Sequence, residues 1–228
     1  GGNNSAQALL VMQDISDLTA AQERSETLFR QLVGTLTEII DARDPWSKHH
    51  SGRVADVATA IAQELGWDED AVESIMIAGQ LVNLGKIFVP IEILTKQTPL
   101  TDDEFQLVRD SMHKGAALVS GLAFEGPVAA ILGQMHENWD GSGNPEGPSG
   151  DAIEPGARIL AIANAFVGMV SARAHRNGLG FDKAADILQG DAGKKYERRS
   201  VAALQSVLEN RGGRERWQHY MDKPNEDA

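Results

Sequence analysis

Residues 134–145 read Gln-Met-His-Glu-Asn-Trp-Asp-Gly-Ser-Gly-Asn-Pro, and the rest of the chain is organised around them. A helical pattern over 126–137 ends here in a histidine and an acid. The residues that follow predict a tight loop, because glycine permits a positive φ and proline removes a backbone donor. Binding and catalytic groups often lie in such loops. A plain helix stop with incidental polar residues is the competing interpretation.

Composition narrows the possible functions. The chain has 228 residues, of which 42% are hydrophobic and 24% charged, and its net charge is −12. This acidic balance argues against general binding to nucleic acid, which depends on excess lysine and arginine. The absence of cysteine excludes disulfides and thiolate metal sites and fits a reducing compartment. With no signal peptide recognisable, we expect a cytoplasmic protein whose chain begins inside a larger one.

The pattern of the longest apolar run does not predict a membrane span. It covers 157–172, is interrupted by Arg158 and Asn164, and is shorter than the ~20 residues that a span needs. We therefore interpret it as a buried core helix.

The N-terminal region predicts a short strand over 6–16 and then one long helix over 17–43. Residues 14–17, Asp-Ile-Ser-Asp, resemble the exit of a PAS sensor domain, which assigns 1–16 to the end of such a domain. The linker helix, 17–40, has an apolar stripe of helical spacing made by Leu18, Leu28, Leu32, Leu36 and Ile39. A core helix is one interpretation. We favour a signalling helix that pairs with a second copy in a homodimer.

The remaining pattern is helical throughout, so the fold class is all-α. Residues 101–104, Thr-Asp-Asp-Glu, form a capping-box sequence that predicts a helix start near Asp102. We assign 41–210 to the helical domain and 211–228 to a loose polar tail, with Trp217 and Tyr220 as the residues able to dock. The predicted helices cover about 50–66, 69–83, 102–113, 126–137, 157–173, 181–190 and 197–210.

Three histidines raise the possibility of a metal site. His50, His113 and His136 each lie near a predicted helix end. Helical domains build metal sites from such side chains, although a single histidine is more often structural. His49, His175 and His219 show no comparable pattern.

Seven stretches of the chain follow one another in a fixed order and spacing. They are Arg43-Asp44-Pro45 with His50-Ser51-Gly52-Arg53-Val54, Leu84-Gly85-Lys86-Ile87 with Pro90, Ile93-Leu94-Thr95-Lys96, Leu100-Thr101 with Glu104-Phe105, His113 with Gly115, His136-Glu137 with Trp139-Asp140-Gly141-Ser142-Gly143 and Pro145, and Ala157-Arg158-Ile159-Leu160. Together they resemble the HD-GYP family, bacterial hydrolases of cyclic di-GMP within the HD phosphohydrolase superfamily. The resemblance implies an HD-domain-like helical bundle, a metal-dependent phosphodiesterase ancestry, and a partner-binding loop at Gly143, Asn144 and Pro145.

The departures from that family weaken the implied metal site. Its metal ligands are replaced at Val82, Asn83, Met135 and Asn164, and its loop tyrosine at Asn144. The remnant is His50, His113 and His136. A paired-metal site needs carboxylates that offset the charge of the cations. We therefore expect no cofactor, or at most one weakly bound Fe, Mn or Zn ion, and we assign no residue a catalytic role.

The resemblance also implies phosphate contacts at Lys86, Arg173 and Arg176, because arginine binds phosphate through two parallel hydrogen bonds. The alternative is that all three are solvated surface cations.

Three functions stay open. The first is an inactive regulatory module that binds a protein such as a GGDEF-type signalling protein. The second is a cyclic di-GMP receptor without hydrolysis, and the third a residual metal-dependent phosphodiesterase.

Overall fold

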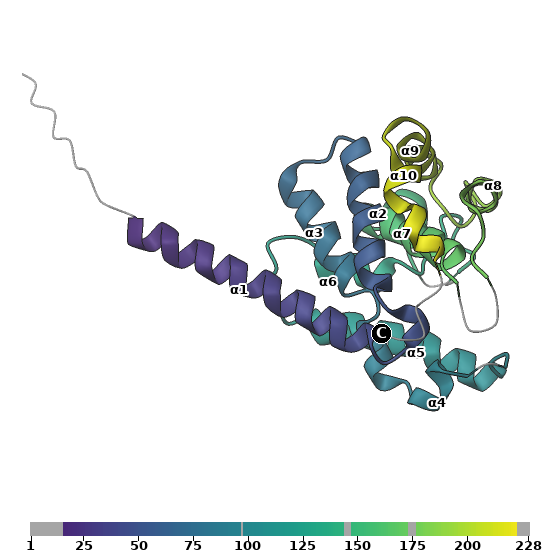
Figure 1. Ribbon diagram of the computed structural model, residues 1–228, viewed down its shortest axis with the longest axis horizontal. Helices are drawn as coiled ribbons and strands as arrows, with labels where there is room; N and C mark the ends of the chain where they lie inside the picture. The colour runs from purple at the N-terminus through teal and green to yellow at the C-terminus, as the bar shows by residue number, and fades with distance from the viewer. Residues whose placement is uncertain (1–15, 97, 144–146, 173–176, 223–228) are drawn as a thin grey trace, which may run out of the picture. The chain divides into compact units, whose positions relative to one another are not determined.

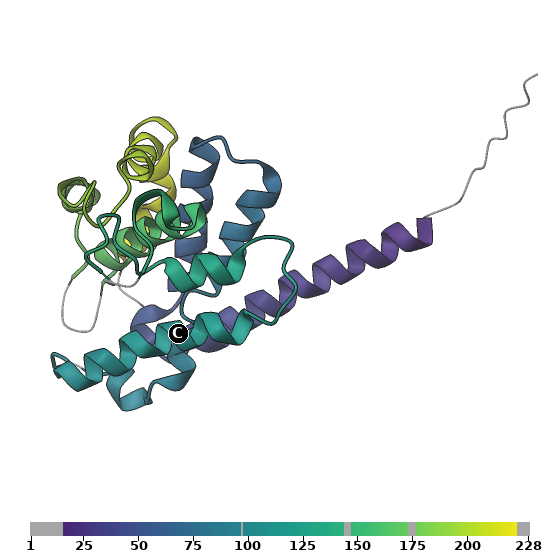
Figure 2. The same cartoon turned by 180° about the vertical axis from the view of Figure 1, so that it is seen from behind.

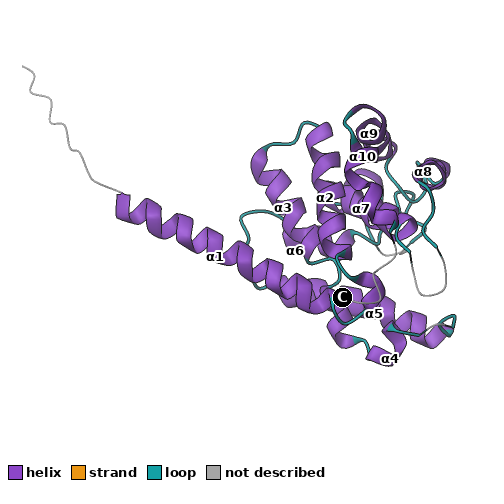
Figure 3. Cartoon of the chain, in the orientation of Figure 1, coloured by secondary structure: helices purple, strands orange, loops and turns teal. Residues whose placement is uncertain are grey.

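A computed structural model describes residues 16–96, 98–143, 147–172 and 177–222. All regular elements in these ranges are helices, and the one β-type pairing there is an isolated bridge between Ala192 and Tyr196 (Figure 3). The all-α prediction is confirmed. The chain divides into two compact units after Leu32. The strand and sensor-domain end that the pattern predicts fall outside the described residues, except for Ser16, which begins a helix.

Helix α1, Ser16–Asp41, carries two apolar faces. In the second unit, Val33 and Ile40 are buried, and the Thr37 hydroxyl donates a hydrogen bond of 3.0 Å to the carbonyl oxygen of Gln80. Leu36 and Ile39 lie on the other face. The helix ends two residues earlier than predicted, because Asp44 is extended before a proline and the chain turns there into the 3-10 helix η1, Pro45–Ser47.

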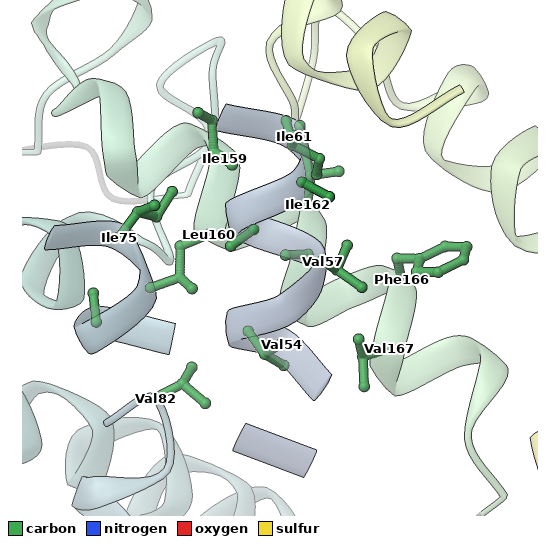
Figure 4. Close-up of a cluster of buried hydrophobic side chains, with 14 of the residues drawn as sticks. Val54, Val57, Ile61, Ile75, Val82, Ile159, Leu160, Ile162, Phe166 and Val167 are labelled. Carbon is green, nitrogen blue, oxygen red and sulfur yellow. The ribbon is translucent and has the colours of Figure 1, made fainter. Parts of the chain in front are cut away.

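The core is centred on helices α2, His50–Glu64, α3, Glu69–Gln80, and α7, Pro155–Val170 (Figure 1). Helix α3 approaches α2 at Gly79, where an added Cβ would lie 2.5 Å from the Cα of Ala55, so a side chain does not fit. Figure 4 shows apolar side chains of α2 and α7 meeting in one cluster, which includes Val54, Val57, Ile61, Ile159, Leu160, Ile162, Phe166 and Val167.

A second close backbone approach positions the functional region. An added Cβ at Gly85 would lie 2.1 Å from the carbonyl oxygen of Ser111, and one at Gly115 would lie 2.5 Å from the backbone nitrogen of Gly85. The 3-10 helix η2, Leu84–Phe88, therefore lies directly against helix α5, Asp102–Val119. The glycines at this contact bring the turn after α3 to the middle of α5.

Helix α5 begins as predicted, with Thr101 and Glu104 forming a capping box. It does not stop near His113, because Gly115 is buried in the contact with η2 and the helix runs on to Val119. The prediction that His113 lies at a helix end is therefore wrong.

The other predicted helices are present with shifted ends, and the pattern missed two short ones. Figures 1 and 2 show their arrangement from opposite sides. The predicted ones are α6, Val128–Gln134, α8, Phe181–Gly190, and α9, Arg198–Asn210; the missed ones are α4, Ile91–Leu94, and α10, Gly213–Trp217, together with the 3-10 helices η3, Gly150–Ala152, and η4, Gln218–Met221.

One stretch, Glu69–Phe88, has the length and hydropathy of a membrane span. Half of it is buried within the fold, and it comprises α3, a turn and η2 rather than one uniform helix. Contacts of α3 with α2, α6 and α7 account for its apolar character, so we assign it to the protein core.

The C-terminal segment docks on α2, which corrects the prediction of a loose tail from residue 211. Trp217 and Tyr220 are almost fully buried. The Asp56 carboxylate accepts hydrogen bonds from Trp217 Nε1 at 2.8 Å and from the Tyr220 hydroxyl at 2.7 Å, and it pairs with Arg216. Burial, with the Asp56 hydrogen bond as a second cause, raises the pKa of Tyr220. The sequence did not predict this contact, because Asp56 lies in another helix that is far from Trp217 and Tyr220 along the chain.

We expect Asp56→Ala to lower the free energy of unfolding by about 3 kcal/mol, because it leaves buried donors unsatisfied. Urea denaturation followed by circular dichroism measures this loss. Asp182→Ala is the matched control, since Asp182 makes an exposed ion pair with Arg214 and its loss has little effect. Equal stability of the two variants would contradict the docked arrangement.

Candidate functional site

His50 opens helix α2 and points its ring toward α7. Its side chain is buried, and Nε2 donates a hydrogen bond of 2.9 Å to Oδ1 of Asn164. A metal ion bound at Nε2 would need the lone pair on that nitrogen and would displace this bond. The asparagine at a predicted ligand position thus holds the histidine in a hydrogen bond between two helices.

Asn83 is held by a carboxylate that sequence reasoning did not single out. Its Nδ2 donates to Oδ1 of Asp41 at 2.8 Å, and both side chains are buried. The same carboxylate accepts hydrogen bonds from the backbone nitrogen of Ser51 at 2.9 Å and from the Ser51 hydroxyl at 2.8 Å. Asp41 therefore caps the start of α2 from the end of α1, and Asn83 completes its hydrogen bonding.

Apolar side chains fill the other two substituted ligand positions. Val82 and Met135 are both buried members of the core cluster, and Figure 4 shows Val82 beside it. With Gly85, Gly115 and His136 they line a cavity of about 10 Å³, room for no more than a single water. Neither side chain supplies a ligand for a hard divalent cation.

His113 and His136 are the other two histidines that the sequence singles out. Burial lowers the pKa of His136, although much of its surface is exposed, and the neighbouring His113 and Arg109 side chains lower it further. The shift favours the neutral form of His136. Arg109, one helical turn before His113 on α5, also makes a long contact of 3.5 Å with the carbonyl oxygen of Gly143. That i, i+4 spacing was visible in the sequence and was missed.

Lys86 lies inside a polar cluster. Its Nζ donates a hydrogen bond of 2.7 Å to the Ser47 hydroxyl and lies 3.5 Å from Asp44 Oδ2. Arg43 holds the same turn by donating to the carbonyl oxygens of Lys86 at 2.7 Å and Val89 at 3.0 Å. The lysine predicted to meet phosphate thus already has an anionic partner within the fold.

The loop after α6 is shaped by its own polar side chains. Asp140 accepts a hydrogen bond from the backbone nitrogen of Ser142, and hydrogen bonds to Ser142 lower the pKa of Asp140. Gly141 has φ +79°. The predicted residues Asn144 and Pro145, like Arg173 and Arg176, lie outside the described residues.

The described residues do not fit a paired-metal centre. No group of three or more histidine, aspartate or glutamate side chains is positioned to hold a metal ion within 16–96, 98–143, 147–172 and 177–222. The structure places neutral amides or apolar groups at the four substituted positions. Without bridging carboxylates, paired cations would repel each other, so no reaction step is assigned to a metal.

Comparison with known proteins matches residues 34–199 to the family model described as HD domain. The chain therefore belongs to the HD domain family. A cyclic di-GMP phosphodiesterase response regulator of Xanthomonas campestris is 34% identical over 82% of this chain and 50% of its own length. A cyclic di-GMP phosphodiesterase of Thermotoga maritima is 31% identical over 80% and 50%. The predicted family resemblance is confirmed, whereas the PAS-like tail stays a prediction.

Solved structures agree with this HD fold. A cyclic GMP-AMP-specific phosphodiesterase of Vibrio cholerae has a TM-score of 0.60 at 17% identity and covers 85% of this chain and 53% of its own. Bd1817, an HDG"Y"P protein of Bdellovibrio bacteriovorus, has a TM-score of 0.58 at 23% identity over 71% and 52%. The chain spans about half the length of the relatives named here.

We expect Asn83→Asp to destabilise the HD domain by about 2 kcal/mol or more at pH 7, because two buried carboxylates would then face each other. Chemical denaturation measures the change. Asn83→Ala serves as the control, because it removes one hydrogen bond and leaves Asp41 bonded to Ser51. If Asn83→Asp is no less stable than Asn83→Ala, Asp41 and Asn83 do not meet as described.

Proposed function

We propose that this HD domain is a regulatory module that has lost phosphodiesterase activity and acts through protein contacts. The observation that carries the proposal is that the side chains at the substituted ligand positions are neutral and are hydrogen-bonded or packed within the fold. Asn83 is bonded to Asp41, Asn164 to His50, and Val82 and Met135 are packed in the core. A domain in this state has no group placed to activate water at paired metals.

Cyclic di-GMP binding without hydrolysis is the second candidate. Its support is the exposed pair of Arg109 and His113 beside the loop at Gly143, together with the substrates named for the relatives. The internal engagement of Lys86 with Asp44 and Ser47 weighs against it. A residual metal-dependent phosphodiesterase is the third candidate, and it rests on the three remaining histidines alone. A cytoplasmic location and a GGDEF-type partner are kept as proposals.

Purified protein is expected to contain less than stoichiometric Fe, Mn or Zn by plasma mass spectrometry and to leave cyclic di-GMP and cyclic GMP-AMP intact. The matched comparison is the variant with Val82→His, Asn83→Asp, Met135→His and Asn164→Asp, which restores the family's ligand types and is expected to retain metal. Turnover by the natural chain that disappears in His113→Ala would overturn the inactive assignment. Calorimetric titration with cyclic di-GMP distinguishes the receptor from the module that acts through protein contacts alone. Heat of binding without turnover supports the receptor.

The module is proposed to receive its signal through a homodimer of helix α1. Leu36 is 48% and Ile39 60% exposed, on a stripe that lies beside the buried stripe of Val33 and Ile40 on the same helix. Their spacing continues a stripe that begins with Leu28 and Leu32, and a stripe of this kind is the seam of a two-stranded coiled coil. An unpartnered apolar face of this length favours association with a second copy.

Leu36→Glu combined with Ile39→Glu is expected to convert the dimer to a monomer, because charges in the seam cannot be desolvated without partners. Light scattering after size-exclusion chromatography gives the mass directly. Arg24→Glu, outside the stripe, is expected to leave the dimer intact. A monomeric natural chain at high micromolar concentration would refute the α1 dimer while leaving the loss of catalysis untouched.

A further inference from the structure

Residues 191–197 form a tightly bonded turn just before helix α9. Gly193 has a φ of +83°, and its backbone nitrogen donates a hydrogen bond of 2.7 Å to the carbonyl oxygen of Tyr196. The carbonyl oxygen of Asp191 accepts hydrogen bonds from backbone nitrogens that follow it in the turn. The turn is also joined to the loop after α6. The backbone nitrogens of Trp139 and Asp140 donate to the carbonyl oxygens of Lys195 and Lys194 at 3.0 and 2.8 Å. The turn is thus a rigid platform.

This platform and the start of α9 carry four exposed cations, which we call the basic patch: Lys194, Lys195, Arg198 and Arg199. They fall within six consecutive positions of a chain that has 33 acidic and 21 basic residues. Two of them occupy the first turn of α9, where the helix dipole is positive and cations are unfavourable. This placement costs stability and so favours a functional explanation over a merely solvated face.

The nearby acids do not neutralise the two arginines of the basic patch. Asp191 pairs with Lys195 at 2.9 Å. The Glu197 carboxylate pairs with Arg158 at 2.9 Å and accepts a hydrogen bond from Ser200. Arg198 lies against the platform, since an added Cβ at Gly193 would be 2.6 Å from its Nε. In the described part of the chain, Arg198 and Arg199 have no carboxylate partner.

We propose that the basic patch docks a short acidic segment of a partner protein. Arginine guanidinium groups bind carboxylates through paired hydrogen bonds, and exposed complementary charge accelerates association. The four cations are exposed on the surface, which suits a segment lying across the patch. The net charge of −12 disfavours a long polyanion such as nucleic acid, which would extend over the acidic remainder of the surface, more than it disfavours a short segment that stays on the patch. The proposal is independent of whether the HD site is active.

The test is fluorescence anisotropy of a labelled peptide of alternating aspartate and glutamate, titrated with the full chain at low ionic strength. Arg198→Glu with Arg199→Glu is expected to weaken binding by about 10-fold or more. The control is Lys114→Glu with Lys183→Glu, which makes the same change in net charge at exposed lysines elsewhere and should change the affinity less than about 2-fold.

The proposal fails if the natural chain does not bind the peptide, or if both double variants lose affinity equally, because the effect would then be one of net charge alone. It also fails if a single-stranded oligonucleotide of equal charge binds as tightly through the same two arginines, which would make the patch a general anion surface. The double variant Arg198→Gln with Arg199→Gln shows whether a loss of binding comes from the lost charge or from misfolding. It removes the charge without reversing it and should lose binding while its thermal unfolding midpoint does not fall, since the two arginines are unfavourable at the start of α9.

Discussion

The buried carboxylate of Asp41 is the constraint on which the candidate site depends. It lies at the end of α1, caps the start of α2 through Ser51, and receives the amide of Asn83 from the turn after α3. A buried carboxylate is stable only when donors surround it, so these three segments are fixed relative to one another. Any movement at the C-terminal end of α1 would act first on this group, which contacts Asn83, one of the four substituted positions.

The substituted positions hold neutral side chains, so they add no uncompensated charge to the interior. A paired-metal site contains anionic ligands that repel one another once the cations are absent. Here Asn83 and Asn164 are neutral amides with partners in the fold, and Val82 and Met135 are packed in the core. The remaining carboxylate has its own donors. In the described residues, the hydrogen bonds at Asn83 and Asn164 are therefore satisfied by groups within the fold.

Glycine contacts make this arrangement possible. Gly85 and Gly115 allow η2 to lie on α5, and Gly79 allows α3 to lie on α2. Backbones that approach so closely leave little room between Val82, Met135 and His136, which explains the small cavity there. Exposed groups lie on the apolar stripe of α1, on the basic patch at the start of α9 and on α5, where Arg109 and His113 are exposed. The substituted positions Val82 and Met135 are buried, so contacts with a partner would have to use these exposed surfaces.

The sequence by itself determined the helices, the family resemblance and the four substituted positions. Periodicity, the capping box at Thr101 and the glycine and proline stops report local preferences, which a chain segment carries alone. The tertiary structure decided which groups meet. Asp41 and Asn83 are 42 residues apart, and His50 and Asn164 are 114 apart. A helical pattern shows which face of a segment is buried but not what it is buried against, because that depends on how helices cross and where glycine lets them touch.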